Sequence, residues 1–263
     1  MTYTTLRSVR AGDSDTTLRE ADVPEATIVL VHGAWADGSS WSLVAPELRR
    51  RGLAVLTPPN LLRGVTTDAP YVTSLVSQRV TVPVVLVGHS YGGFVITHAA
   101  AGAGDVRALV YVDAFIPDEG ETVFQILGGS GSALDVPDPT TVLDLAGYPG
   151  APEGDVEAFL KPATVHGSFA QDLPEADREL IVESQRPITL SANLTPGGEP
   201  GWRSLPSWAV VGTEDKVIPP DTQRKMAERA GATITEAPGS HVSMVSHPQV
   251  TIDAILAAVE ATA

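Results

Sequence analysis

Short runs of consecutive apolar residues recur along most of the chain, and they alternate with segments in which apolar residues return every three or four positions. Such runs are typical of strands that are buried on both faces, whereas the spacing of three and four is typical of one helix face. We therefore predict strands at residues 27–31, 53–57, 82–87, 106–112, 208–211 and 233–235, and helices at about 41–48, 71–79, 91–101, 221–229 and 252–259. This alternation predicts an α/β fold with a mostly parallel, doubly wound sheet.

The alternation stops between residues 115 and 206, where the chain is rich in proline, glycine and aspartate. A segment of this length is too long for a loop in a compact domain, so we interpret it as an inserted domain. We predict a mainly helical cap at residues 115–206, with short helical pieces at 156–160 and 174–183. The remaining residues, 1–114 and 207–263, then form the core.

Composition narrows the function classes. The formal charge of −15 over 263 residues argues against nucleic acid as a partner, because its phosphates would be repelled. The absence of cysteine excludes disulfides and a cysteine nucleophile. No apolar stretch is long enough for a membrane span, and residues 1–26 are polar, without the apolar segment of a signal peptide. For residues 1–26 we predict one marginal strand and a surface arm. A cytoplasmic location is the default expectation, although earlier removal of a secretion signal is compatible with the sequence.

The main chemical signal is the sequence Gly88-His89-Ser90-Tyr91-Gly92, which follows the apolar run at 84–87 directly and precedes a helical pattern. Gly-x-Ser-x-Gly at a junction of strand and helix is typical of a sharp turn that exposes the serine hydroxyl. Glycine is expected on both sides because a side chain there would clash with the crossing backbone. The alternative is a structural turn whose serine only caps the helix.

A serine hydroxyl becomes a good nucleophile when an imidazole takes its proton and a carboxylate orients that imidazole. Asp215 follows the fifth predicted strand and His241 the sixth, so both are expected at the carboxyl edge of the sheet, near Ser90. We predict Ser90, His241 and Asp215 as nucleophile, base and acid. Asp113, at the end of the fourth predicted strand, is the alternative acid, and Glu214 is a weaker candidate.

The chain resembles the α/β-hydrolase superfamily, and within it the branch of cap-bearing plant methylesterases, hydroxynitrile lyases and small bacterial esterases. The resemblance rests on His-Gly-Ala-Trp-Ala-Asp-Gly-Ser-Ser-Trp at residues 32–41, on the Ser90 motif, on Gly-Thr-Glu-Asp at 212–215 and on Gly-Ser-His at 239–241. It implies that the backbone N–H groups of Ala34 and Tyr91 form an oxyanion hole and that His32 is structural. Two such donors would stabilise a developing alkoxide.

The other histidines have simpler explanations. We expect His89 to be packing or pocket wall, His98 to be structural, and His166 and His247 to lie at the surface or in the cap. Because no pair of histidines has the helical spacing of a metal site with a carboxylate, we predict no metal ion, and no cofactor.

These observations predict a serine hydrolase that cleaves a small, uncharged, partly apolar carboxylic ester through an acyl-enzyme. Apolar cap residues could line its pocket, or could form the cap's own core: Phe115, Phe124, Leu127, Phe159, Phe169 and Trp202. Alternatives are hydrolysis of a carbon–carbon bond, perhydrolysis, or a non-catalytic ligand-binding protein on the same scaffold. Cyanohydrin cleavage is disfavoured, because the related lyases have lysine immediately after the histidine, where this chain has Val242. A homodimer through the cap or the sheet edge is compatible with the sequence.

Overall fold

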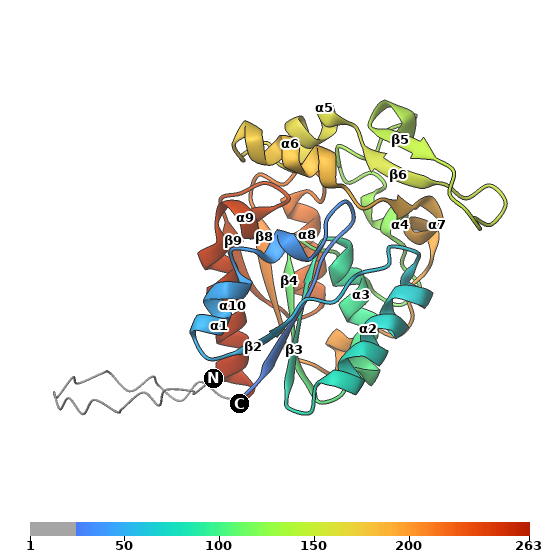
Figure 1. Cartoon of the computed structure of the whole chain (residues 1–263). Helices are drawn as coiled ribbons and strands as arrows, with labels where there is room; N and C mark the ends of the chain where they lie inside the picture. Colours follow the sequence, from blue (N-terminus) through green and yellow to red (C-terminus); the bar gives the residue numbers. More distant parts are fainter. Residues whose placement is uncertain (1–24) are drawn as a thin grey trace, which may run out of the picture.

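A six-stranded parallel sheet forms the centre of the protein, as described by a computed structural model of residues 25–263 (Figure 1). The strand and arm predicted for residues 1–26 fall almost entirely outside this range. In spatial order the strands are β2 (Ala54–Leu56), β1 (Thr27–Val31), β3 (Val84–His89), β4 (Val106–Val112), β8 (Ser207–Gly212) and β9 (Thr233–Ala237). Every pairing in this sheet is parallel. The predicted α/β architecture, with its mostly parallel sheet, is therefore confirmed.

Helices cover the sheet on two sides (Figure 1). The α1 and α10 helices lie on one side of it and α2 and α3 on the other. The core helices are α1 (Ala45–Arg50), α2 (Val65–Arg79), α3 (Tyr91–Ala99), α8 (Pro220–Arg229), α9 (Ser243–Ser246) and α10 (Pro248–Ala261), with short 3₁₀ turns η1 (Gly38–Trp41) and η2 (Ala100–Gly102). The helix predicted at 41–48 is in fact divided into η1 and α1, because α1 begins only at Ala45, with Pro46 in its first turn.

The apolar runs occupy the inner strands because those strands have no solvent-facing side. Every residue of β1, β3 and β8 is buried, and β4 exposes only Arg107. Parallel strands covered by helices on both faces require continuous apolar sequence, which is the pattern that predicted them.

Residues between β4 and β8 form a separate layer over the carboxyl ends of the strands, at the top of Figure 1. We use the name cap for this layer. Its helices are α4 (Val123–Leu127), α5 (Pro162–Thr164), α6 (Glu175–Ser184) and α7 (Leu190–Leu194), with the 3₁₀ turns η3 (Pro139–Thr141) and η5 (Gly201–Arg203) and the π-helical turn η4 (Val165–Phe169). A three-stranded antiparallel sheet joins β5 (Leu143–Ala146), β6 (Glu157–Leu160) and β7 (Ile188–Thr189).

The helical piece predicted at 156–160 is wrong, because this segment is the strand β6. Ala158 and Leu160 are buried while Glu157 and Phe159 are half-buried, which is the alternation of a strand with one covered face. The helix predicted at 174–183 is confirmed as α6. Within residues 25–263, no helix is both long and apolar enough to cross a membrane.

Candidate active site

Ser90 occupies the sharp corner between β3 and α3. Its φ of +52° lies in the left-handed region that residues with a side chain rarely adopt. The flanking glycines allow this corner: a Cβ atom on Gly88 would lie 2.5 Å from the carbonyl oxygen of Gly92, and one on Gly92 would overlap the carbonyl oxygen of Val31. The close backbone crossing that the sequence motif predicted is therefore present.

The structure brings the three predicted side chains into one hydrogen-bonded chain. The Oγ of Ser90 lies 2.8 Å from Nε2 of His241, and Nδ1 of the same ring lies 2.7 Å from Oδ2 of Asp215. All three residues are at most 3% exposed. This arrangement can move a proton from the serine hydroxyl to the imidazole.

Four donors surround the carboxylate of Asp215. Its Oδ1 accepts the backbone N–H groups of Val217 at 2.7 Å and Ile218 at 2.9 Å, and its Oδ2 accepts Nε2–H of Gln223 and Nδ1–H of His241, both at 2.7 Å. Burial raises the pKa of Asp215, while the bonds from the two backbone groups and Gln223 oppose that rise by stabilising the ionised form. An ionised Asp215 can only accept, so it orients Nδ1–H of the imidazole toward itself.

Burial lowers the pKa of His241 from 6.5 to about 3. The imidazole is therefore neutral near pH 7. With its Nδ1 protonated toward Asp215, its Nε2 is a free base directed at the hydroxyl of Ser90.

Asp113 lies beside this chain without joining it. It is fully buried at the end of β4, with a φ of +46°, and its Oδ2 accepts the N–H of Ser243 at 2.9 Å. Among residues 25–263, its Oδ1 has no hydrogen-bond partner. Burial, together with the nearby charge of Asp215, raises the pKa of Asp113 well above its usual range. It forms no hydrogen bond with His241, and Glu214 is exposed, so of the three acidic candidates only Asp215 contacts the imidazole.

Two backbone N–H groups lie beside the serine. Tyr91 is the first residue of α3, so its N–H has no acceptor within the helix. The loop carrying Ala34 comes close, because a Cβ atom on Gly33 would lie 2.7 Å from Cβ of Ser90. Among the hydrogen bonds of residues 25–263, none uses the N–H of Ala34 or Tyr91. Both N–H groups are thus available to an oxyanion.

Other buried polar residues, which the sequence did not reveal, hold this machinery in place. Asp68 accepts the hydroxyl of Tyr91 at 2.9 Å and also the N–H groups of residues 63 and 64. It shares the buried face of α2 with Val65, Val72 and Val76. An acidic residue within an apolar helix face was the available sequence signal, and it marks a buried polar group that needs partners.

His89 has a more specific place than the wall or packing role predicted from its position. Its Nε2 lies 2.7 Å from the carbonyl oxygen of His241, and the two rings are 5.0 Å apart between centroids. It thus holds the backbone that carries the imidazole. His32 packs as a structural residue: its ring contacts Gly33 O at 2.9 Å and accepts the N–H of Asn60 at 3.0 Å.

The remaining histidines lie elsewhere. The ring of His98 contacts the Phe94 carbonyl oxygen one turn back in α3, and His166 pairs with Glu179 within the cap. Within residues 25–263, no three His, Asp or Glu side chains are grouped so that they could hold a metal ion.

A small cavity of about 30 Å³ is lined by Ser90 together with Ala34 and Tyr91. Apart from Ser90, Tyr91 and Asn193 its lining residues are apolar, and none of them is an acid or a base that is charged near pH 7. The lining residues are Ala34, Trp35, Ser90, Tyr91, Phe115, Val123, Leu127, Leu134, Ile188, Asn193 and Val217. Six of these eleven lining residues belong to the cap.

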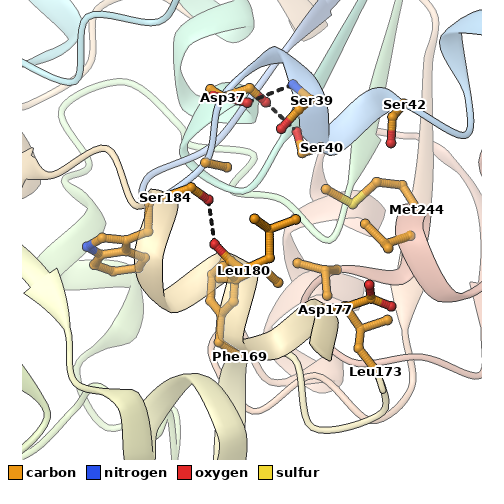
Figure 2. A pocket seen from close by; sticks show the side chains of 15 residues that line it. Asp37, Ser39, Ser40, Ser42, Phe169, Leu173, Asp177, Leu180, Ser184 and Met244 are labelled. Carbon is orange, nitrogen blue, oxygen red and sulfur yellow. Dashed lines mark hydrogen bonds between the residues drawn. The ribbon is translucent and has the colours of Figure 1, made fainter. Parts of the chain in front are cut away.

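Figure 2 shows a second, larger hollow, of about 170 Å³, between the cap and the core. Phe169 and Leu180 reach it from the cap and Met244 from α9, while Ser39 and Ser40 lie along its rim. Trp35 lines both hollows, and its ring packs nearly perpendicular to the ring of Phe169 at 6.0 Å between centroids.

The apolar cap residues divide between wall and scaffold. Phe115 and Leu127 line the cavity at Ser90, and Phe169 packs against the ring of His241 at 5.2 Å between centroids. Phe124 is 64% exposed. Phe159 and Trp202 line neither hollow, and Trp202 donates its ring N–H to the Pro117 carbonyl oxygen.

Two consecutive cap residues bind the loops that carry the acid and the base. Gln171 donates its side-chain amide to the carbonyl oxygen of Glu214, next to Asp215. Asp172 accepts the N–H of Ser240, next to His241, at 3.0 Å. The cap therefore contacts both loops at the backbone.

The fold agrees with the comparison against known families. A family model described as the alpha/beta hydrolase family matches residues 28–254. The chain belongs to the alpha/beta hydrolase family. Within it, Methylesterase 2 of Arabidopsis thaliana is 28% identical over 249 residues, which cover 87% of this chain and 94% of that protein.

Two further members extend the comparison. The carbendazim hydrolyzing esterase of Nocardioides sp. (strain SG-4G) is 39% identical over 114 residues, which cover 39% of this chain and 47% of that protein. The crystal structure of polyneuridine aldehyde esterase superposes with a TM-score of 0.74 at 21% identity, covering 90% of this chain and 99% of that one. The predicted place of this hydrolase near the plant methylesterases is confirmed.

Proposed function

We propose that the protein is a serine hydrolase that cleaves a small, uncharged, partly apolar carboxylic ester. The observation that carries this proposal is the unbroken chain from Ser90 through His241 to Asp215, which ends beside two backbone N–H groups without acceptors. The esterase names of its relatives support the same reaction class.

The proposed reaction has two halves. The Oγ of Ser90 attacks the ester carbonyl carbon while Nε2 of His241 takes the hydroxyl proton, and Asp215 stabilises the resulting imidazolium. The negative charge on the former carbonyl oxygen is stabilised by the N–H groups of Ala34 and Tyr91. The imidazolium then protonates the leaving alcohol, and the acyl group stays on Ser90. Water attacks the acyl-enzyme by the same route and releases the acid.

The size and lining of the cavity at Ser90 support the proposed substrate class. The cavity of about 30 Å³ is far below the roughly 300 Å³ at which ligand pockets start, so it suits no more than a small group. An apolar wall without charged side chains favours an uncharged substrate, because a buried unpaired charge is costly. We propose that the segment 115–206 acts as the cap that selects this group.

Carbon–carbon cleavage of a cyanohydrin is not supported. The residue after His241 is the buried Val242, which cannot stabilise a departing cyanide as a lysine would. Perhydrolysis and hydrolysis of a carbon–carbon bond next to a ketone would use the same catalytic groups, and no feature of the cavity favours them over an ester.

Labelling and turnover of Ser90 test the proposal directly. We expect a fluorophosphonate to label the protein at one serine and p-nitrophenyl esters of short acids to give a burst of p-nitrophenol. Ser90→Ala should abolish both, while Ser77→Ala, which removes an exposed hydroxyl on α2, should change neither. A protein that resists labelling and does not turn over any ester would instead be a binding protein on a hydrolase scaffold. Full activity in Ser90→Ala would also contradict the proposal.

A further inference from the structure

Trp35 holds a backbone conformation that a tryptophan does not adopt without support. It follows Ala34 directly and has a φ of +59°, in the left-handed region where a bulky side chain is strained. Such strained residues persist when surrounding contacts hold them, and they gather at functional sites. The contacts that hold Trp35 therefore bear on the loop that carries the oxyanion hole.

Three cap segments contact Trp35. Its backbone N–H donates to the carbonyl oxygen of Arg186 at 3.0 Å, and its ring N–H donates to that of Ala158 at 2.9 Å. Its ring lies nearly perpendicular to the ring of Phe169, which in turn packs against the ring of His241. Only 8% of Trp35 is exposed. The tryptophan belongs to the core in sequence, but these three contacts all lie in the cap.

The oxyanion loop is held differently on its two sides. On the side before Ala34, the core itself holds the loop through the bonds between His32 and Asn60. On the side after Ala34, the cap contacts of Trp35 take over this task. Since a displacement of about 1 Å can cost 10²-fold in rate, the distance of the Ala34 N–H from the developing charge depends on both sides.

We propose that Trp35 is a positioning residue through which the cap holds the oxyanion hole in its active geometry, so that hydrolysis requires the cap to be seated on the core. This inference rests on the proposed hydrolase function. It adds a second task to the cap, which then supports the chemical step in addition to lining the cavity.

Gln185 offers a way to test transmission from inside the cap. Its side-chain oxygen accepts the N–H of Leu160 at 2.7 Å, and its amide donates to the carbonyl oxygen of the same residue at 3.0 Å. It thereby ties the segment before Arg186 to β6, which contains Ala158. These are the two segments whose carbonyl groups bind Trp35. Gln185 lines neither hollow, so its effect on catalysis must pass through other residues.

The first variant is Trp35→Phe, which keeps an aromatic ring and removes the ring N–H. We expect kcat per fluorophosphonate-titrated serine to fall about 10-fold, with KM within about 3-fold of the original, because the lost interaction acts on the transition state. The rate of fluorophosphonate labelling should fall in parallel, since that reaction also places charge in the oxyanion hole. Trp202→Phe removes an equivalent ring N–H that donates to Pro117, outside both hollows, and should leave kcat unchanged.

The second variant, Gln185→Ala, should lower kcat in the same way. Combined with Trp35→Phe, it should add less than its separate effect, because both changes act on one contact set. Active-site titration separates a lower rate per site from a smaller folded fraction.

Three results would overturn the inference: an unchanged kcat per titrated serine in Trp35→Phe, a raised KM with unchanged kcat, or strictly additive effects of the two changes. The first would leave Trp35 a purely structural residue and the second a substrate-binding wall. Failure of the unmodified protein to label or turn over would instead remove the hydrolase proposal itself.

Discussion

The core and the cap of this protein differ in how directly the sequence indicates their structure. The strands predicted at 27–31 and 106–112 have the observed bounds of β1 and β4. In the cap, the segment predicted as helical at 156–160 is a strand, and the small sheet to which it belongs was not predicted. The core strands are buried by their own helices, whereas cap elements are short and depend on neighbours distant in sequence. A local sequence pattern is therefore enough to predict a strand where both of its faces are buried.

The largest expected effect distinguishes the two buried aspartates of the core. Asp215→Asn should lower kcat/KM about 10⁴-fold, because an amide can hold the imidazole in the wrong tautomer. Asp113→Asn should stay within about 10-fold, since Asp113 accepts the N–H of Ser243 and forms no hydrogen bond with His241. Steady-state kinetics on one ester compare the two variants. A larger loss from Asp113→Asn would identify Asp113 as the acid.

The next effect concerns packing in the two regions. Gly92→Ala should destabilise the protein by about 3 kcal/mol, because the new Cβ would overlap the Val31 carbonyl oxygen. Gly147→Ala in the cap has open space around it and no left-handed φ, so it should raise the free energy of unfolding by about 0.5 kcal/mol. Urea denaturation measures both changes. Equal destabilisation by the two would contradict the picture of a tightly crossed core beside a more open cap.

The pH dependence tests how deeply the cap buries the base. Catalysis needs neutral His241, and burial lowers the pKa of His241 to about 3, so the neutral form persists as the pH falls through 6.5. At about pH 5, an imidazole with an ordinary pKa of about 6.5 would lose about 30-fold in its neutral fraction. We expect kcat/KM to fall much less than this at that pH, with circular dichroism showing that the protein stays folded. An acid limb centred at 6.5 or above would contradict burial as the dominant influence on the pKa of His241.

The smallest effect separates two neighbouring residues of the cap helix α4. Leu127→Ala should enlarge the cavity at Ser90 and shift the preference toward longer acyl chains by about 10-fold. Phe124, in the preceding turn, is 64% exposed, so Phe124→Ser should leave the preference unchanged. Rates on p-nitrophenyl esters of graded acyl length measure the shift. A similar shift in both variants would contradict a selective role of the cavity wall.

The sequence predicted the parts of the site that follow from local geometry. Ser90 was recognisable because its turn requires glycine on both sides, and Asp215 and His241 because each follows a strand of the same sheet. The sequence favoured Asp215 as the acid but left Asp113 as an alternative, since both follow strands. In the structure Asp215 is distinguished by its contact with His241 and by Gln223, on a helix eight residues further along the chain.

Other parts depend on contacts between distant segments, which no local pattern encodes. The hydrogen bond between Asp68 and Tyr91 joins two helices. The hydrogen bond of His89 to the backbone of His241 joins residues that are 152 positions apart in the sequence. The sequence assigned no role to Trp35, because its hydrogen-bond partners are backbone carbonyl groups of the cap. Every residue has a backbone carbonyl group, so the residue type does not indicate which carbonyl accepts a hydrogen bond.

The bonds of Gln171 and Asp172 have a consequence for chimaeric proteins. An inserted domain that contacted the core only at its two junctions could be exchanged between related proteins as an independent unit. In this protein, two adjacent side chains near the middle of the insertion fasten the segments beside Asp215 and His241. A transplanted insertion would therefore need a matching amide and carboxylate at these two positions, and a graft that preserved only the junction sequences would leave the recipient's catalytic loops without their fastening.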